Sequence, residues 1–313
     1  MNKTLSVIIP VFNEQESIFQ NTKIINDNLN DLVKESLISE FEIIIVDDGS
    51  TDKSWEEVLK LSASDIKIIA IRLTKNFGHQ SALIAGLDQS NNDMLLTIDA
   101  DLQDDISAIK KMIEKIYDGN EIVFGVRNNR KTDSLFKKIS ANFYYFIIKK
   151  LNKDMIQNHA DFRLITRKCF LNFKEYKEVN LFLRGIFSSM YSRYGIVHYS
   201  RKNRKKGVTK YTLLKMVKLG LDGITSFSLT PLRLVFYLGL IISILSLIII
   251  SYYLYLHIFK SVTIKGWAST VLPIYFLGGI QLLSIGLIAE YIGKIFLETK
   301  KRPKYIIDEK INK

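Results

Sequence analysis

The stretch Glu42–Asp52 reads EIIIVDDGSTD and joins a short apolar run to an acidic end. A continuous apolar run that is closed by turn-forming residues is typical of a strand that is buried on both faces. Gly49 suits a tight turn, and Asp52 suits the cap of a following helix. The stretch therefore predicts a central strand with carboxylates directly after it.

The same alternation of apolar strand, turn and helix recurs along the first part of the chain. We expect five strands and the helices that follow four of them: Leu5–Val11 with a helix from about Gln15, Glu42–Val46 with a helix from Lys53, Ile66–Leu73 with a helix from about Gly78, Met94–Ile98 with a helix over Ile106–Tyr117, and Glu121–Gly125. This order predicts an α/β fold with a mostly parallel sheet that is covered on both faces. In such sheets ligands bind beyond the carboxyl ends of the strands.

Carboxylates follow three of these strands. The first strand runs into Glu14, the second into Asp47 and Asp48, and the fourth into the DADLQDD segment at 99–105. Each aspartate alone is explained as well by a turn or a helix cap, but the two motifs in this order favour a binding site. Because like charges repel at close range, carboxylates that converge on one sheet edge require a cation or a hydrogen-bonding ligand.

The residue types suit a nucleotide and a hard cation. Mg²⁺ and Mn²⁺ take oxygen ligands and typically use one or two carboxylates together with substrate phosphates. Asp47 or Glu14 would accept hydrogen bonds from a base or a ribose.

Composition narrows the partners. The formal net charge of +12 favours a polyanionic partner, which is nucleic acid, anionic lipid headgroups or phosphorylated small molecules. The single cysteine, Cys169, excludes an intramolecular disulfide and a cysteine-based zinc cluster, and its surroundings favour a small buried hydrophobic residue over a nucleophile. The apolar run Leu5–Phe12 is too short and too soon polar for a signal peptide.

Two uncharged runs of 23 residues, Leu234–Leu256 and Trp267–Ala289, lie near the end of the chain. Each exceeds the roughly 20 residues that cross a bilayer, and a buried core helix is the alternative. Lysine and arginine flank the pair on both outer sides and are sparse in the connector His257–Gly266. The positive-inside rule therefore predicts a multi-pass protein of the cytoplasmic (inner) membrane, with the N-terminal part and the C-terminal tail both cytoplasmic.

Two further segments combine an apolar stripe with lysines. Ser134–Lys150 and Val208–Ile224 either lie in the membrane interface or pack on the sheet. Between them, Arg201–Lys206 carries five positive charges in six residues. Such a run is either a solvated face or an attraction to an anionic leaflet, to which each charge contributes roughly 1 kcal/mol.

Taken together, these motifs resemble a family 2 glycosyltransferase of the GT-A fold, close to the dolichol-phosphate mannose synthase and bacterial polyprenyl-phosphate glucosyltransferase branch. The resemblance runs from Leu5 to about Ile307. It includes Lys75-Asn76-Phe77-Gly78-His79, Gly125-Val126-Arg127, Asp161-Phe162-Arg163-Leu164, Arg184-Gly185, Thr209-Lys210-Tyr211, Gly278-Gly279-Ile280-Gln281, Glu290-Tyr291-Ile292-Gly293 and Arg302-Pro303-Lys304-Tyr305.

The resemblance implies an organisation and a set of site residues. The chain would consist of a cytoplasmic GT-A domain over residues 1–206, a juxtamembrane amphipathic helix over 207–230, a two-helix transmembrane hairpin over 231–290 and a cytoplasmic tail over 291–313. The nucleotide-sugar contacts would be Pro10, Phe12, Glu14, Asp47, Asp48, Lys75 and Asp99. Asp101 and Gln103 would hold Mg²⁺ or Mn²⁺, and Asp161 and Asp101 would be the catalytic residues. The acceptor phosphate would meet Arg127, Lys137, Lys138, Ser140, Arg201, Arg204 and Lys210.

Three positions depart from the family pattern. Asp105-Ile106 replaces the usual Pro-Pro, Phe12 stands where tyrosine is commoner, and Ile186–Ser189 lacks the frequent Trp-x-Gly. The last departure leaves the identity of the sugar open.

The expected activity is transfer of a hexose from a nucleotide-sugar, which we take to be a UDP-sugar, to a polyprenyl phosphate such as undecaprenyl phosphate, for glycosylation of the cell envelope. A phosphate monoester with a second pKa near 6 is mostly a dianion at neutral pH and needs little help from a base. We therefore expect Asp161 to orient groups or balance charge, with an ion pair to Arg163 or Arg167 as the alternative. The expected partners also include a bilayer with anionic lipids, and a homo-oligomer is compatible with the sequence.

Two rival functions use the same features. A processive membrane polysaccharide synthase would need a wider channel than two spans make, and the chain lacks its Gln-x-x-Arg-Trp motif. A non-catalytic scaffold that binds lipid or nucleotide is disfavoured by Asp99, Asp101 and Asp161. Nucleic-acid binding is disfavoured because the basic runs adjoin the apolar spans rather than stacking aromatics.

Overall fold

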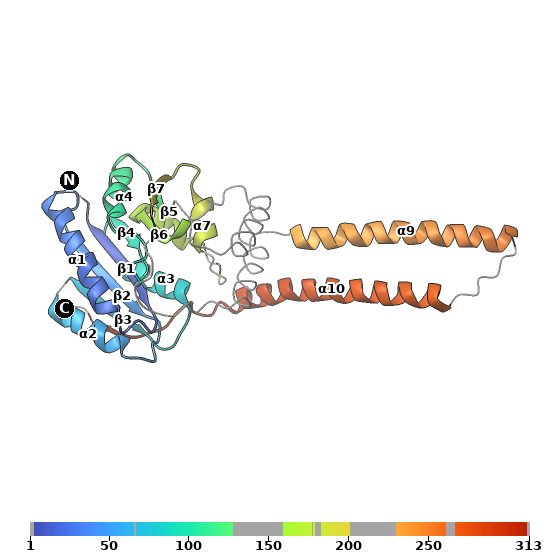
Figure 1. The fold of residues 1–313 in the computed structure, drawn as a ribbon, viewed down its shortest axis with the longest axis horizontal. Helices are drawn as coiled ribbons and strands as arrows, with labels where there is room; N and C mark the ends of the chain where they lie inside the picture. The colour runs from blue at the N-terminus through green and yellow to red at the C-terminus, as the bar shows by residue number, and fades with distance from the viewer. Residues whose placement is uncertain are drawn as a thin grey trace. The chain divides into compact units, whose positions relative to one another are not determined.

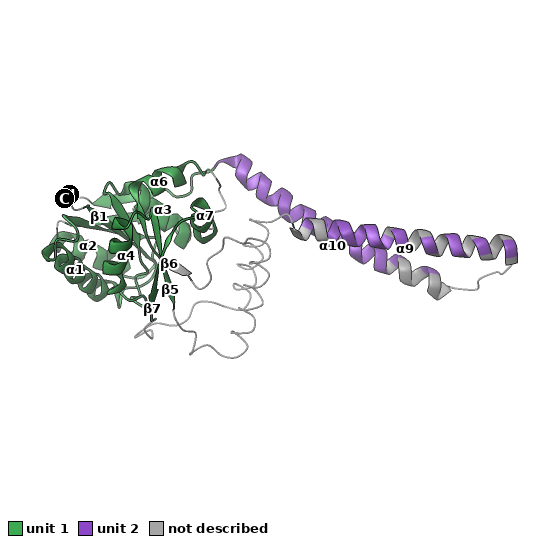
Figure 2. Ribbon diagram, turned by 90° about the horizontal axis from the view of Figure 1, so that it is seen from above, with its two compact units in different colours: residues 1–216, 302–313 green, residues 217–301 purple. Residues whose placement is uncertain are grey.

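The computed structural model describes residues 3–65, 67–127, 159–176, 178, 183–200, 230–260 and 267–311. The chain divides into two compact units, residues 1–216 with 302–313 and residues 217–301 (Figure 2). The first unit holds the sheet and its helices, and the second holds two long helices. The boundaries at 206, 230 and 290 stay predictions.

The first unit is built on an eight-stranded sheet in the order β7-β5-β6-β4-β1-β2-β3-β8 (Figure 1). The strands are β1 (Leu5–Val11), β2 (Phe41–Asp47), β3 (Ile68–Leu73), β4 (Met94–Thr97), β5 (Ile122–Arg127), β6 (His159–Thr166), β7 (Gly195–Tyr199) and β8 (Ile307–Ile311). All five predicted strands are present, and none of their ends shifts by more than two residues.

The sheet is mixed rather than parallel throughout. Strands β4, β1, β2 and β3 are parallel neighbours, as predicted, and β5 is parallel to β7. However, β6 runs antiparallel between β4 and β5, and β8 runs antiparallel beside β3. The sequence does not indicate β6, β7 and β8, because none of them contains the long apolar run that marks a doubly buried strand.

The antiparallel pairing of β6 with β4 matters for the site. Met94 pairs with Thr166, and Thr97 pairs with Arg163. If this register is continued past the end of β4, Asp99 stands opposite Asp161. The beginning of β6 therefore lies at the carboxyl ends of the parallel strands, where the predicted site is expected.

Helices cover both faces of the parallel strands. On one face α1 (Ile18–Lys34), α2 (Ser54–Ser64) and α4 (Ala108–Tyr117) form the larger core with alternate residues of β1 and β2. On the other face α3 (His79–Gln89) packs against Ile44 and Val46. Because successive strand residues point to opposite faces, each continuous apolar run fills both cores.

Two short helices lie beside β6. They are α6 (Arg167–Lys174) and α7 (Leu183–Met190), and the ring of Phe173 on α6 stacks on Phe187 of α7 at 4.8 Å between centroids. Cys169 is fully buried on α6, and burial raises the pKa of its thiol to about 12. It is a core residue, as the sequence predicts.

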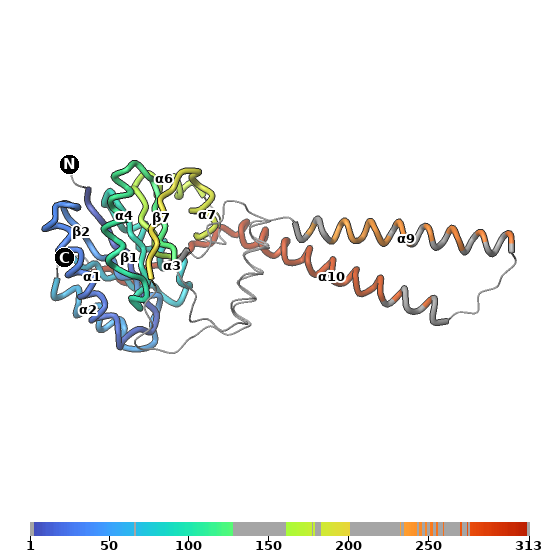
Figure 3. The backbone as a smooth tube through the Cα atoms, turned by 45° about the horizontal axis from the view of Figure 1, so that its top comes forward, coloured from blue at the N-terminus to red at the C-terminus, as the bar shows by residue number. Residues whose placement is uncertain are grey.

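The last residues of the chain, 302–313, belong to the first unit, and Figure 3 marks the C-terminus there. Strand β8 forms the edge of the sheet beside β3. The backbone N–H of Thr74 donates to the carbonyl of Ile306 at 3.0 Å, and the hydroxyl of Tyr305 donates to Asp88 at 3.0 Å. Tyr305 and Ile307 also pack against the core beneath α3. Part of the predicted tail is therefore an ordered part of the sheet.

The second unit contains α9 (Thr230–Lys260) and α10 (Trp267–Lys300), which pack against each other. They cover both predicted apolar runs. Among the described residues one stretch, Phe276–Lys300, is long and apolar enough to cross a membrane by length and composition, and it overlaps the predicted run Trp267–Ala289. Its large apolar side chains are exposed, as Leu283 is at 76%. The span predicted over Leu234–Leu256 stays a prediction.

The hydroxyl of Tyr305 provides a test of the returning strand. We expect Tyr305→Phe to lower the free energy of unfolding by about 1 kcal/mol, because Asp88 loses a hydrogen bond. This corresponds to a fall of about 2–4 °C in Tm. Thermal unfolding of the full chain in detergent measures it, with the exposed Tyr176→Phe as the control. Equal changes in the two variants would contradict the assignment.

Candidate active site

The loops after β1 and β2 hold each other in place. The side-chain oxygen of Asn13, a residue with φ of 56°, accepts a hydrogen bond from the backbone N–H of Thr51 at 2.8 Å. The N–H of Glu14 donates to the hydroxyl of Ser54 at 2.7 Å. Asp52 accepts from the N–H of Ser54, the first residue of α2, at 2.9 Å. The N-cap residue of α2 is Lys53, so Asp52, the predicted cap, lies one residue before the cap position.

Asp48 and Gly49 join the β2 loop to the loop before α3. The two carboxylate oxygens of Asp48 accept from the N–H groups of Phe77 at 2.7 Å and Gly78 at 2.9 Å. Gly49 has φ of 67°, and a Cβ there would lie 2.5 Å from the carbonyl carbon of Lys75. Both residues therefore shape the loop that carries Lys75. A direct contact of Asp48 with a nucleotide stays a prediction.

Asp47 offers an unpaired oxygen at the end of β2. The residue is fully buried, and one carboxylate oxygen accepts from the N–H of Ser50 at 3.2 Å and lies 3.8 Å from Nε of Arg72. Its other oxygen has no partner among the described residues. Burial raises the pKa of Asp47, and the hydrogen bonds from Ser50 oppose this shift. A buried, unsatisfied carboxylate oxygen is costly, and a ligand N–H or hydroxyl would satisfy it.

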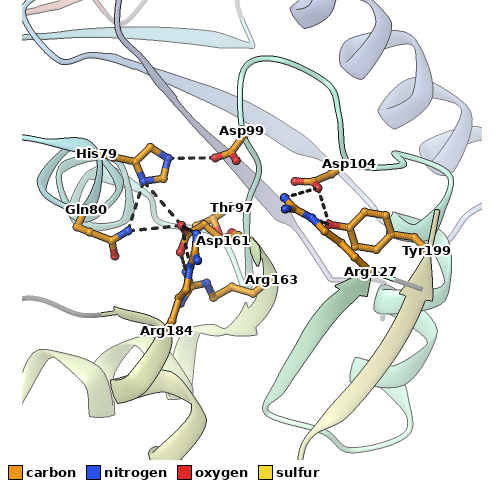
Figure 4. Close-up of polar contacts among 10 residues, drawn as sticks. All are labelled: His79, Gln80, Thr97, Asp99, Asp104, Arg127, Asp161, Arg163, Arg184 and Tyr199. Carbon is orange, nitrogen blue, oxygen red and sulfur yellow. Dashed lines mark hydrogen bonds and ion pairs between the residues drawn. The ribbon is translucent and has the colours of Figure 1, made fainter. Parts of the chain in front are cut away.

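His79, at the start of α3, lies between two carboxylates (Figure 4). Its Nε2 is 3.0 Å from Oδ1 of Asp99, and its Nδ1 is 3.9 Å from Oδ2 of Asp161. Burial alone would lower the pKa of His79, but the hydrogen bond and charge of Asp99 and the charge of Asp161 raise it overall. Burial would likewise raise the pKa of Asp99, but His79 outweighs this and lowers it.

The sequence places His79 in the Lys75–His79 motif and indicates no role for it. Its partners are far away along the chain, so no local pattern indicates them. The one available signal is its place directly after the Lys75–Gly78 loop, at the edge where carboxylates gather.

Asp161 is buried and paired with two arginines. It accepts from Arg163 and, at 2.8 Å, from Nη2 of Arg184. Burial would raise the pKa of Asp161, but Arg184, Arg163 and His79 hold it far below its ordinary range. The ion pair with Arg163 that the sequence left open is formed, whereas Arg167 donates to the carbonyl of Asn92 at 2.9 Å. So stable an anion is a poor proton acceptor at neutral pH.

The loop after β4 carries the residues expected to hold a metal. A carboxylate oxygen of Asp101 accepts from the N–H of Gln103 at 3.2 Å, Leu102 has φ of 48°, and Gln103 is buried. No group of three metal-ligating side chains occurs in the described part of the chain. Mg²⁺ needs only one or two protein carboxylates beside phosphate and water oxygens. The carboxylate of Asp101 and the amide oxygen of Gln103 are therefore ligands of the type that a hard divalent cation takes.

A second cluster lies at the ends of β5 and β7. Nη2 of Arg127 is 3.3 Å from Oδ1 of Asp104, and its Nε donates to the hydroxyl of Tyr199 at 3.1 Å. The Tyr199 hydroxyl donates to the same oxygen of Asp104. The sequence predicts a role for Arg127 and does not indicate its two partners, Asp104 and Tyr199.

The remaining predicted residues fall into two groups. Pro10 pairs with Val46 inside the sheet, Phe12 and Glu14 are half-buried in the next loop, and the exposed Lys75 places its ammonium 5.2 Å from the ring centroid of Phe77. These side chains come from the same sheet edge as Asp47 and Asp99. The other group lies outside the described residues: Lys137, Lys138, Ser140, Arg201, Arg204 and Lys210.

Comparison with known proteins identifies the family. Residues 6–176 match glycosyl transferase family 2, and residues 230–295 match the GtrB C-terminal hairpin. The chain belongs to glycosyl transferase family 2. The chain is therefore a glycosyltransferase, and membership of this family confirms the predicted resemblance.

Several full-length relatives belong with it. The chain is 43% identical over 307 residues to the uncharacterized glycosyltransferase YkoT of Bacillus subtilis, covering 97% of this chain and 91% of that protein. It is 39% identical over 304 residues to a prophage bactoprenol glucosyl transferase homolog of Escherichia coli, covering 97% and 98%. It is 38% identical to the bactoprenol glucosyl transferase of Shigella phage SfX over the same shares of the two chains.

The charge on His79 predicts a pH-dependent contribution to stability. Because the folded-state pKa of His79 is raised, its stabilising effect is fully present below its unfolded pKa of about 6.5 and is lost as the pH rises through the folded value. We therefore expect the Tm difference between the wild type and His79→Gln to be largest near pH 6 and to shrink toward alkaline pH.

Thermal unfolding of the full chain in detergent, without divalent metal, between pH 6 and pH 9 measures this difference. The exposed His198→Gln is the matched control. A Tm difference for His79→Gln that stays constant across the range would show that the imidazole charge does not hold Asp99 and Asp161 together.

Proposed function

We propose that this glycosyltransferase moves a hexose from a UDP-sugar to a polyprenyl phosphate, such as undecaprenyl phosphate, at the cytoplasmic face of a membrane. One observation carries the proposal. The similarity to proteins named bactoprenol glucosyl transferase extends over 97% of the chain. It therefore includes both the part that matches glycosyl transferase family 2 and residues 230–295, which match the GtrB C-terminal hairpin. The acceptor class follows from these relatives, and the chemistry follows from the residues of the site.

The donor would lie over the carboxyl ends of β1, β2 and β4. The unpaired oxygen of Asp47 is suited to a donor group of the base or ribose. Pro10 and Phe12, at the end of the neighbouring strand β1, would contact the same nucleotide. The exposed ammonium of Lys75 is suited to the diphosphate, because it stands on a loop that Asp48 holds rigid.

Asp101 and Gln103 would hold Mg²⁺ or Mn²⁺ beside the donor. When it is bound, such an ion neutralises the charge that develops on the departing nucleoside diphosphate. Asp101 would therefore act in catalysis by holding the ion that stabilises the leaving group.

The reaction is a direct displacement. An oxygen of the acceptor phosphate forms the new bond to the anomeric carbon while the bond from that carbon to the diphosphate oxygen breaks, which inverts the configuration. The attacking phosphate is a dianion, so no proton has to be removed. Asp161 stays ionised, and through His79 and Arg184 it fixes the positions of charged groups around the sugar.

The membrane would hold the lipid acceptor. The exposed apolar surface of Phe276–Lys300 needs lipid or protein to cover it, and lysine and arginine beside the apolar runs favour a bilayer with anionic lipids. We propose a multi-pass protein of the cytoplasmic membrane, with the domain boundaries given above. Arg127 is the described residue that would meet the acceptor phosphate.

An assay of defined components tests the proposal. Full-length protein in detergent is incubated with Mg²⁺ or Mn²⁺, a panel of nucleotide-sugars and undecaprenyl phosphate, and the lipid is analysed by mass. We expect one hexose to be added to the lipid phosphate, with release of UDP. A ladder of sugar polymers would indicate a processive synthase, and liposome binding without use of any nucleotide-sugar would indicate a scaffold.

Two substitutions test the roles of the carboxylates. We expect Asp101→Asn and Asp161→Asn each to lower kcat by roughly 10²-fold or more, because each removes charge from the reacting region. The exposed Asp31→Asn, which carries its carboxylate on α1, is the control.

Because Asp161→Asn leaves the buried Arg163 without its anion, the Tm of each variant is measured beside its kcat. If a folded Asp161→Asn protein keeps nearly full turnover at pH 7.5 with undecaprenyl phosphate, Asp161 has no part in the mechanism.

A further inference from the structure

Three side chains from separate elements meet at the ends of β5 and β7 (Figure 4). Arg127 and Tyr199 are direct partners in the register of these parallel strands, and Asp104 comes from the loop after β4. The guanidinium of Arg127 reaches Asp104 through Nη2 at 3.3 Å and Tyr199 through Nε at 3.1 Å. One carboxylate oxygen of Asp104 accepts hydrogen bonds from both partners.

The three residues differ in exposure. Asp104 is 2% exposed and Tyr199 is 3% exposed, whereas the side chain of Arg127 is 26% exposed. Two members of the cluster are therefore buried, and the third brings a positive charge to the surface. The two buried residues hold the guanidinium of Arg127 from the interior of the protein.

The packing around Tyr199 is built to hold its hydroxyl in place. Its ring lies edge-on against Phe162 at 5.4 Å between centroids and 87° between planes. A Cβ at Gly125 would lie 2.5 Å from Cδ1 of Phe162 and 3.0 Å from Cε1 of Tyr199. The Gly125-Val126-Arg127 motif thus combines the space that the two rings need with the arginine that the Tyr199 hydroxyl contacts.

A buried carboxylate that pairs with an arginine is weak evidence for a stabilising role, because desolvation offsets most of the attraction. Its clearer effect is geometric. Arginine has five N–H donors in a planar fork, and Asp104 and Tyr199 use the Nε side of that fork. The remaining donors of a fixed guanidinium suit the oxygens of a phosphate.

We propose that Asp104 and Tyr199 are positioning residues that hold Arg127 as a preorganised receptor for the phosphate monoester of the acceptor. The inference rests on the proposed function and deepens it, because it assigns two residues that select a phosphate at this edge of the sheet. The donor diphosphate offers similar oxygens, so the test separates the two sources.

Tyr199→Phe is the decisive variant, since it removes one hydroxyl and keeps the ring against Phe162. We expect KM for undecaprenyl phosphate to rise roughly tenfold or more, which corresponds to the loss of one hydrogen bond to a charged group. We expect KM for the nucleotide-sugar to stay within about twofold of the wild type, because the hydroxyl acts on the site of the acceptor phosphate and not on the donor. Tyr194→Phe, which alters a tyrosine packed edge-on against Phe124, is the matched control.

Arg127→Lys completes a double-mutant cycle. A lysine cannot make the two bonds of the fork, so Tyr199→Phe should add little to Arg127→Lys if the hydroxyl acts through the guanidinium. Additive effects on the acceptor KM would overturn the proposal. So would a rise in the donor KM alone.

A purely structural role makes a different prediction. If Tyr199→Phe lowers Tm but leaves the acceptor KM unchanged, the cluster supports the fold only and the proposal is wrong. Asp104→Asn, which keeps an accepting oxygen and removes the charge, repeats the test where Tyr199→Phe does not fold. A wild type that forms no glycolipid overturns the proposed function itself, whereas an active wild type with unchanged variants overturns this inference alone.

Discussion

The antiparallel pairing of β6 with β4 determines which carboxylates meet in this protein. A strand that entered the sheet in the other direction would carry Asp161 to the opposite edge, away from Asp99. The pairing brings the carboxylates of Asp99 and Asp161 together. Their repulsion is offset by the side chains of His79, Arg163 and Arg184, which lie against them. The acidic edge is therefore balanced by groups of the chain itself, and its geometry exists before any ligand arrives.

The D-D-G-S-T-D segment serves mainly as internal support. Asp48 holds the neighbouring loop, Gly49 lets that loop approach, Ser50 and Asp52 fix the turn and the next helix, and Asp47 alone keeps an unpaired oxygen. The motif suggests several contacts with a ligand, but most of its residues hold the loops in place and only Asp47 offers an oxygen to a ligand. Leaving that oxygen unsatisfied is unfavourable, and the hydrogen-bonded loops around it hold it in place nevertheless.

The sequence predicted the parts of the fold that rest on local pattern. Continuous apolar runs located β1 to β5, and the acidic residues after them located the edge of the site, because both signals lie within a few residues of each other. Strand β6 was missed since Asp161 and Arg163 interrupt its apolar pattern, and their charges are compensated only by residues distant in sequence. The same distance conceals His79, Asp104 and Tyr199, whose roles depend on partners that only the folded sheet brings near.

Strand β8 has a consequence for the order in which the molecule is made. A nascent chain folds from its N-terminus, so β1 to β3 leave the ribosome long before the strand that borders β3. Until both long helices of the second unit have been synthesised, the backbone N–H and C=O groups along the outer side of β3 have no neighbour from β8. An unpaired edge of this kind invites pairing with other chains. A fragment that stops before α9 would keep that edge bare permanently, however complete its catalytic residues are.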